Sequence, residues 1–150
     1  MPGKFEKLGI SFQYPENWTL DEEDALAGCK SVTLYSPGGG FWSVAVHPGL
    51  AEPADLAKAA ADALCEEYEE VELEYVCEEL AGCELIGYDL NFYCLDLTNS
   101  ARIRCLRTSH HAYSVFCQAE DREFKQIEAV FQAMTVSLTS GLKDLRYSSG

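Results

Sequence analysis

The second half of this sequence constrains the fold most, because it is a series of strand-like runs separated by short turns. Four runs follow one another: Val71–Glu78, Cys83–Asp96, Ala101–Thr108 and Ala112–Ala119. The turns expected between them are Ala81-Gly82, Asn99-Ser100 and Ser109-His110-His111. Turns this short join antiparallel neighbours, so this half of the chain predicts an antiparallel meander.

The first half adds three runs of the same kind: Ile10–Tyr14, Ser31–Ser36 and Phe41–His47. The second and third are joined by Pro37-Gly38-Gly39-Gly40, which is rich in turn formers and predicts a hairpin. These glycines lead into a strand and are not followed by the Lys-Ser/Thr pair of a phosphate-binding loop. We therefore interpret them as a turn.

Two segments have helical periodicity. The first helix is expected from Pro53 to about Tyr68, with Asp55 in its first turn. Its expected apolar face consists of Leu56, Ala60, Ala63, Leu64 and Tyr68. The second is expected over Arg122–Met134, capped by Asp121 and extended to Leu138, with an apolar stripe of Phe124, Ile127, Val130, Phe131 and Met134.

Helices placed around a long meander predict an α+β domain. A length of 150 residues fits one domain, which we expect over residues 1–138, with a polar, frayed tail over 139–150. The amino terminus has no apolar signal region, and no run of about 18 apolar residues occurs. These features predict a cytoplasmic protein that does not insert into a membrane.

The net charge of −14 argues against nucleic acid as a partner, because a polyanion would be repelled. The acidity is concentrated: no Lys or Arg lies between Lys58 and Arg102. This gap favours a basic partner or a loosely held cation, for example at Glu66 and Glu70, which are spaced i, i+4. The alternative is a solvated surface kept soluble by charge.

The seven cysteines show no CxxC pair and no zinc-site spacing. Most fall in strand-like runs, where a reduced cysteine packs as a small apolar residue. If Ser109–Ala112 forms a turn, Cys105 and Cys117 come close across a hairpin, and a disulfide is the alternative.

Signatures of catalysis are absent from the sequence. No G-x-S-x-G or H-E-x-x-H motif occurs, and the adjacent His110 and His111 point to opposite sides of an extended chain. His47 ends a strand, where a core or capping role is favoured over catalysis. We predict no catalytic residue, no cofactor and no metal site.

Two groups of side chains are candidates for binding. Arg102 and Arg104 share one face of a strand, with Arg107 nearby, and either pair with Glu84 or Glu74 on neighbouring strands or bind an acidic partner. Aromatic residues, including Trp42, Tyr88 and Phe92, either line a groove for a peptide or apolar ligand or fill the two cores of a covered sheet.

The order of elements resembles that of the PsbP-like superfamily. The resemblance rests on Gly9–Trp18, which matches a G-[IV]-x-F-x-[YF]-P-x-x-W opening, on Val32–Pro37, on the acidic Ala-rich helix and on a closing segment that ends at Ser137-Leu138. It implies an α/β/α sandwich with a central antiparallel sheet of about six or seven strands. The superfamily includes an extrinsic photosystem II subunit, a Ran nucleotide-release factor and bacterial secretion adaptors, none a well-established enzyme.

The leading hypothesis is therefore a non-catalytic adaptor or chaperone-like domain that binds another protein of unknown identity. The alternative is a domain that binds a small molecule or metal ion in an aromatic pocket or on the acidic surface. The candidate interaction residues are Arg102, Arg104, Arg107, Trp42, Tyr88 and Phe92.

Overall fold

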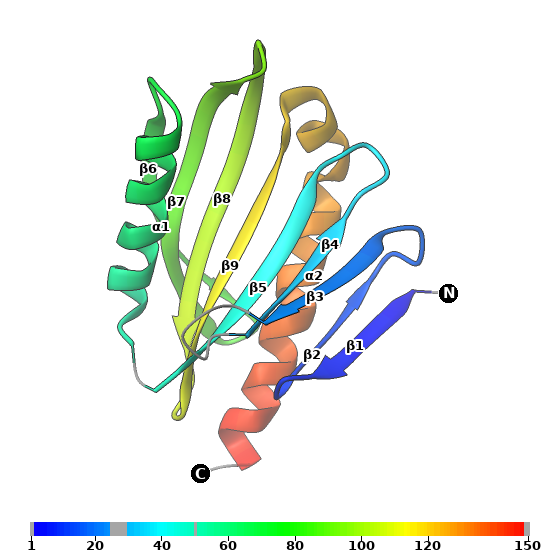
Figure 1. The fold of residues 1–150 in the computed structure, drawn as a ribbon. Coiled ribbons are helices and arrows are strands. Elements are labelled where there is room, and N and C mark those ends of the chain that lie inside the picture. Colours follow the sequence, from blue (N-terminus) through cyan, green and yellow to red (C-terminus); the bar gives the residue numbers. More distant parts are fainter. Residues whose placement is uncertain (1, 25–29, 50, 149–150) are drawn as a thin grey trace.

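A seven-stranded antiparallel sheet forms the middle layer of the structure, with one helix on each face (Figure 1). A computed structural model describes residues 2–24, 30–49 and 51–148. The sheet has the order β3-β4-β5-β9-β8-β7-β6. Its strands are β3 (Thr19–Asp24), β4 (Lys30–Tyr35), β5 (Phe41–Pro48), β6 (Glu72–Leu80), β7 (Cys83–Cys94), β8 (Leu97–Arg107) and β9 (His111–Glu120).

The predicted α+β class and the meander from β6 to β9 are confirmed. One of its turns was placed wrongly. The β7–β8 turn is Leu95-Asp96, where φ is 53° and 64°, whereas Asn99 and Ser100 lie inside β8. Two positive φ values match a type I′ turn, whose twist suits a two-residue hairpin. The sequence signal failed because Leu95 is an unusual residue for that conformation.

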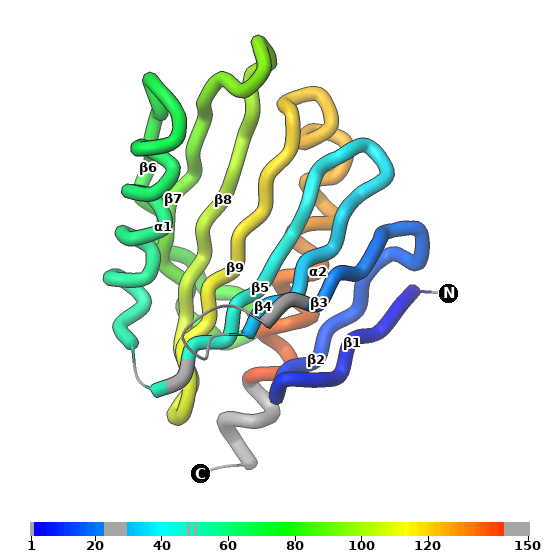
Figure 2. The backbone as a smooth tube through the Cα atoms, viewed as in Figure 1, coloured from blue at the N-terminus to red at the C-terminus, as the bar shows by residue number. Residues whose placement is uncertain are grey.

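A separate hairpin, β1 (Gly3–Lys7) and β2 (Ile10–Tyr14), lies beside β3 (Figure 2). The sequence predicted β2 but neither β1 nor β3. In β1 only Phe5 is buried, and β3 has the sequence TLDEED, so neither strand shows the alternation that marks a half-buried strand. Both are edge or accessory strands that pair because their neighbours supply the template.

Helix α1 (Pro53–Glu67) covers β7 and β8 on one face of the sheet. Pro53 occupies its first turn, as predicted. Of the predicted apolar face, Leu64 is buried and Leu56, Ala60 and Tyr68 pack against the same core, whereas Ala63 is exposed. Ala57 and Ala61, which were not predicted, are also buried. Small alanines allow the helix to approach the sheet closely.

Helix α2 (Asp121–Ser148) crosses the opposite face and is longer than the predicted helix. Instead of fraying after Leu138, it continues through Thr139 and Leu142, both fully buried. Its start also differs from the prediction: the carboxylate of Glu120, and not that of Asp121, accepts hydrogen bonds from the first backbone N–H groups, at 3.0 and 3.4 Å. Among the described residues, neither helix is long and apolar enough to cross a membrane.

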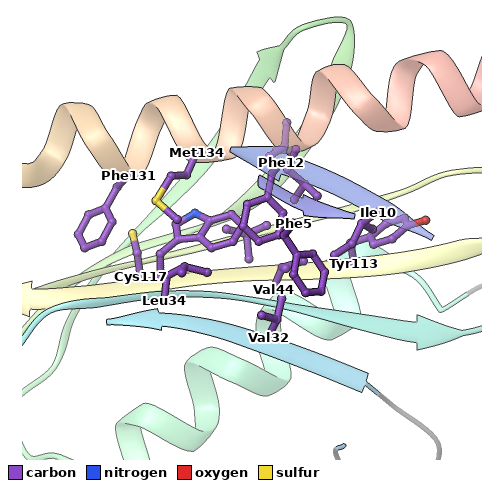
Figure 3. Close-up of a cluster of buried hydrophobic side chains, with 14 of the residues drawn as sticks. Phe5, Ile10, Phe12, Val32, Leu34, Val44, Tyr113, Cys117, Phe131 and Met134 are labelled. Carbon is purple, nitrogen blue, oxygen red and sulfur yellow. The ribbon is translucent and has the colours of Figure 1, made fainter. Parts of the chain in front are cut away.

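Two hydrophobic cores lie on the two faces of the sheet. The larger packs α2 and the β1–β2 hairpin onto β4, β5 and β9, and Trp42, Phe12 and Phe131 are among its largest fully buried side chains. Figure 3 shows Phe12 and Phe131 within this core. The smaller packs α1 onto β7 and β8. A residue's position along a strand therefore decides which core it enters, because neighbouring residues point to opposite faces.

Candidate functional site

Alternation along β8 divides its side chains between the two faces of the sheet. Ile103 and Cys105 enter the core under α1, whereas Arg102 and Arg104 point to the face that carries α2. The shared face of the two arginines was predicted, but not the helix that covers it. Both arginines pair with acidic residues of neighbouring strands, as one of the two alternatives predicted, but the partners are Glu78 and Asp89, with Glu128 on α2, and not Glu84 or Glu74. Strand register, which the sequence does not reveal, selects these partners.

Arg104 is the central group of this cluster, with only 7% of its surface exposed. Its guanidinium donates to Glu78 Oε1 at 2.9 Å and to Asp89 Oδ1 at 2.7 Å, and Nη1 also donates to the Ile103 carbonyl at 3.0 Å. Burial lowers the pKa of Arg104, but the hydrogen bonds to Asp89 and Glu78 outweigh burial and leave the pKa raised. Arg104 is therefore a fixed positive charge.

Gly87 makes this arrangement sterically possible. It lies on β7 directly between Arg104 on β8 and Val76 on β6, so the arginine must pass over it to reach Glu78. A Cβ at Gly87 would lie 1.7 Å from the Ile103 carbonyl oxygen. Glycine is the residue that permits such close approach of two backbones.

Arg102 lies two residues before Arg104, on the same face of β8. It borders an open cleft of about 580 Å³ between the sheet and α2. Its guanidinium contacts Glu128 on α2 and lies 5.0 Å from the ring centre of Phe124. We call this region the arginine cleft; it is lined by Glu78, Asp89, Arg102, Arg104, Lys125 and Glu128. Three positive and three negative side chains leave it without a net formal charge, so it favours neither simple anions nor simple cations.

A second surface lies at the β7–β8 turn, which projects at the end of the sheet (Figure 2). Tyr93, Leu95 and Leu97 are exposed by 63%, 91% and 49%. We call these three residues the hairpin tip. Sequence reasoning missed it, although the run Tyr93 to Leu97 contains three large apolar residues around a turn and was the available signal.

Tyr93 of the hairpin tip lies on the same face of β7 as the arginine cleft, whereas Leu97, which pairs with Cys94, points to the α1 side. Asp89, Asn91 and Tyr93 alternate along the strand, so all three point to the α2 side. The Ser100 hydroxyl donates to Asp121 at the start of α2 at 2.8 Å, which fixes the helix beside this strip. A partner on the α2 side can therefore contact Tyr93 and the charged cleft together.

The structure separates the other candidate interaction residues. Arg107 lies on the α1 side and pairs with Glu52 at 3.0 Å. Trp42 is fully buried under α2, whereas Phe92 is buried under α1 and stacks on Tyr68 at 4.4 Å. Tyr88 is half-buried on the α1 side. Of the two alternatives for the aromatic residues, the structure therefore matches the filling of two cores, because Trp42 packs on one face of the sheet and Phe92 and Tyr88 on the other.

The cysteines are free thiols in the described part of the chain, and Cys29 lies outside the described residues. The disulfide alternative is wrong: Cys105 pairs in register with Ser114, and Cys117 with Arg102, which puts the two sulfurs on opposite faces of the sheet. Burial raises the pKa of Cys105 to about 11 and that of Cys117 to about 12. Both thiols therefore stay protonated at neutral pH.

The structure brings together one serine and one histidine that the sequence did not connect. His47 Nε2 lies 2.9 Å from Ser114 Oγ across β5 and β9. Burial lowers the pKa of His47, which keeps the imidazole neutral at neutral pH. The pair forms a cross-strand hydrogen bond on the α1 side, away from the arginine cleft.

Cation binding by the acidic segment has little geometric support. Glu70 lies beyond the end of α1, with φ at 53°, so Glu66 and Glu70 do not share a helix face as predicted. Within residues 2–24, 30–49 and 51–148, no three His, Cys, Asp or Glu side chains gather closely enough to hold a metal ion.

Comparisons with known proteins show likeness in structure and none in sequence. No family model and no curated protein matches the chain. The solution structure of cyanobacterial PsbP (CyanoP) from Synechocystis sp. PCC 6803 is similar, with a TM-score of 0.65 and 11% identity over 91% of this chain and 90% of that one.

Two other bacterial structures are similar over most of their length. PA94 from Pseudomonas aeruginosa, a protein of unknown function, has a TM-score of 0.55 and 10% identity, covering 91% of this chain and 95% of that one. LpqN of Mycobacterium tuberculosis, involved in cell envelope biogenesis, has a TM-score of 0.50 and 12% identity, covering 89% and 86%. These likenesses confirm a PsbP-like fold and, at such low identity, the fold alone.

Proposed function

We propose that this chain is a non-catalytic protein-binding domain that contacts its partner through the hairpin tip and the adjacent arginine cleft. The PsbP-like fold supports an accessory or interaction role. The observation that carries the proposal is the exposure and the backbone conformation of Leu95. Its side chain is 91% exposed, and its backbone is in the left-handed region.

Leucine is unfavourable at this position in two respects. The left-handed conformation is strained for a residue with a branched side chain, and Asn or Gly is preferred in such turns. An exposed leucine also gains nothing from burial within the domain. A partner that covers the side chain would contribute about 1.5–3 kcal/mol by removing it from water, which offsets both disadvantages.

The shape of the surface also favours a protein partner. The arginine cleft of about 580 Å³ opens to solvent on the same face of β7 as Tyr93 and is lined mainly by charged groups. Small-molecule sites are more often enclosed and apolar. A mixed-charge cleft next to exposed aromatic and aliphatic residues matches the rim and centre of a protein interface.

The experiment combines crosslinking with matched variants. A photoreactive benzoylphenylalanine at position 95 should crosslink one partner in the cells that make the protein, whereas the same group at exposed position 17 should not. The variant Y93T/L95N/L97T should lose that crosslinked or co-purified partner. Tyr35→Thr removes an aromatic residue that is 41% exposed on β4 and should leave capture unchanged.

A stability measurement separates function from folding. Leu95→Asn alone should raise the free energy of unfolding by about 0.5–1 kcal/mol, because Asn tolerates the left-handed conformation, while it weakens capture. Loss of capture together with loss of stability, or equal capture by the triple variant and the wild type, would contradict the proposed surface. Labelling of Ser114 by a fluorophosphonate probe would contradict the non-catalytic assignment.

A small apolar ligand is the second candidate, because a groove of about 380 Å³ lies between α2 and the end of β2. Tyr14, Pro15, Val130 and Met134 line it. Nile red fluorescence should rise on binding, and Ala133→Trp, which fills the groove from exposed helix surface, should abolish the rise. An unchanged signal in that variant would exclude this groove as the binding site.

A further inference from the structure

We propose that the outer edge of β6 pairs with an extended, basic segment of the partner, which adds a strand to the sheet. This inference rests on the proposed function, because it names the chemistry of the partner segment. It concerns a surface different from the hairpin tip, so the two can be tested separately.

β6 is the unprotected edge of the sheet. The two edges are β3 and β6, and β3 is flanked by the β1–β2 hairpin, with Lys7 Nζ lying 3.1 Å from Glu22 Oε1 (Figure 1). The two helices pack mainly on other strands: α1 on β7, β8 and β9, and α2 on β2, β8 and β9. Neither covers β6 as the β1–β2 hairpin flanks β3. None of the nine residues of β6 is buried. Its outward N–H and C=O groups are therefore a template for another strand.

The side chains of β6 alternate in chemistry between its two faces. Leu73 and Tyr75 point to the α1 side and are 46% and 61% exposed. Glu72 and Glu74 point to the α2 side, where Glu78 is already bound by Arg104. A strand laid against this edge would meet apolar groups on one face and free carboxylates on the other.

Charge selects the partner. Glu72 and Glu74 have no ion-pair or hydrogen-bond partner among the described residues, and the chain supplies no Lys or Arg between residues 58 and 102. Opposite charges on adjacent strands attract, and like charges directly opposite one another repel. The complementary segment therefore alternates Lys or Arg with apolar residues, its basic side chains facing the α2 side.

The same rule disfavours a second copy of this chain as the occupant. An antiparallel β6–β6 pair centred on Val76 would set Glu74 of each copy opposite Glu78 of the other. Each such juxtaposition is destabilising. The edge is suited to a different, basic chain.

The test uses the intact protein and a nine-residue peptide that alternates Lys with Val. Fluorescence anisotropy should detect binding that weakens with added salt, and hydrogen exchange should slow at the amides of β6 but not at those of β3. A peptide of the same composition with its lysines in one block should bind at least about fivefold more weakly, because only alternation places every charge on one face.

Variants of the protein distinguish strand pairing at β6 from general attraction of a basic peptide to an acidic protein. E72Q/E74Q should weaken binding of the alternating peptide by about two- to fivefold per charge. E6Q/E16Q removes the same number of charges on the far side of the molecule and should leave binding within twofold. Of two peptides N-methylated on alternate amides, only the one blocked on the edge that faces β6 should fail to bind, since N-methylation removes the donor.

The outcomes distinguish this inference from the proposed function. Equal weakening by the two double variants, equal binding of both methylated peptides, or dimerisation of the chain through β6 would overturn it. If crosslinking from position 95 captures a partner while β6 amides remain unprotected in that complex, only this inference fails. If position 95 captures nothing, the proposed function fails whatever the peptide does.

Discussion

Replacing Arg104 by methionine should destabilise the domain by about 3 kcal/mol. The substitution removes hydrogen bonds to Glu78 and Asp89, and a hydrogen bond to a charged group is worth about 1.5–3 kcal/mol. The side chains of Glu78 and Asp89 are 31% and 35% exposed, so water can replace part of the lost hydrogen bonding. The loss of stability therefore stays near the lower end of the range for two such hydrogen bonds. A domain of this size, stable by about 5–15 kcal/mol, should remain folded at 25 °C.

Urea unfolding is the appropriate assay. With a slope of about 2 kcal/mol per molar urea, the midpoint should fall by about 1.5 M without a change in slope. Arg102→Met is the matched control, because its side chain is 23% exposed and its ion pairs lie nearer the surface. It should cost about 1 kcal/mol or less.

A triple variant tests the mechanism. In R104M/E78Q/D89N no uncompensated carboxylate remains, so it should lie within about 1 kcal/mol of the wild type and be more stable than R104M alone. A single substitution that costs less than about 1 kcal/mol, or a triple variant as unstable as the single one, would refute the view that Arg104 neutralises two adjacent carboxylates.

Three further predictions concern other parts of the fold. Gly87→Ala should lower the free energy of unfolding by about 3 kcal/mol or more in urea, because the new Cβ would lie 1.7 Å from a backbone oxygen. Gly9→Ala, where a Cβ meets no atom within 4 Å, should lower it by only about 1 kcal/mol, because of the positive φ. Similar losses for the two variants would contradict the steric argument. At pH 8, Ellman's reagent should modify Cys105, with its pKa of about 11, at least about 100-fold more slowly than exposed Cys65, and equal rates would disprove the burial. Because the pKa of His47 is lowered from 6.5, the folded chain binds fewer protons than the unfolded one, so stability is lost as pH falls through 6.5 towards the lower folded value. The wild-type protein should therefore lose unfolding free energy between about pH 7.5 and 5.5, and His47→Gln should remove the share of this loss that comes from His47. A loss of the same size in the variant would contradict the role of His47.

Local patterns were sufficient to predict most of the elements. The glycine turns at Ala81-Gly82 and Pro37–Gly40 both join hairpins, since φ and ψ at a turn depend on the residues in it. The second helix was ended too early at Leu138, although Leu138 and Leu142 continue its apolar spacing of three and four residues. The polar residues between them concealed that continuation.

The candidate site was predicted only in part. The shared face of Arg102 and Arg104 follows from the period of a strand, but their partners lie on β6, β7 and α2, up to 26 residues away in the sequence. Exposure of the hairpin tip was missed because the Leu95-Asp96 turn was taken as part of a strand, where apolar residues are more often buried than not.

The residues alone determined where most of the strands, turns and helices form, because side-chain period and turn chemistry act over a few positions. Only the tertiary structure decided which face each side chain enters, as Trp42 and Phe92 illustrate, and which carboxylates meet Arg104. Register and helix placement set those contacts, and both depend on burying the two cores together. The same packing left the edge of β6 and the side chain of Leu95 without a cover.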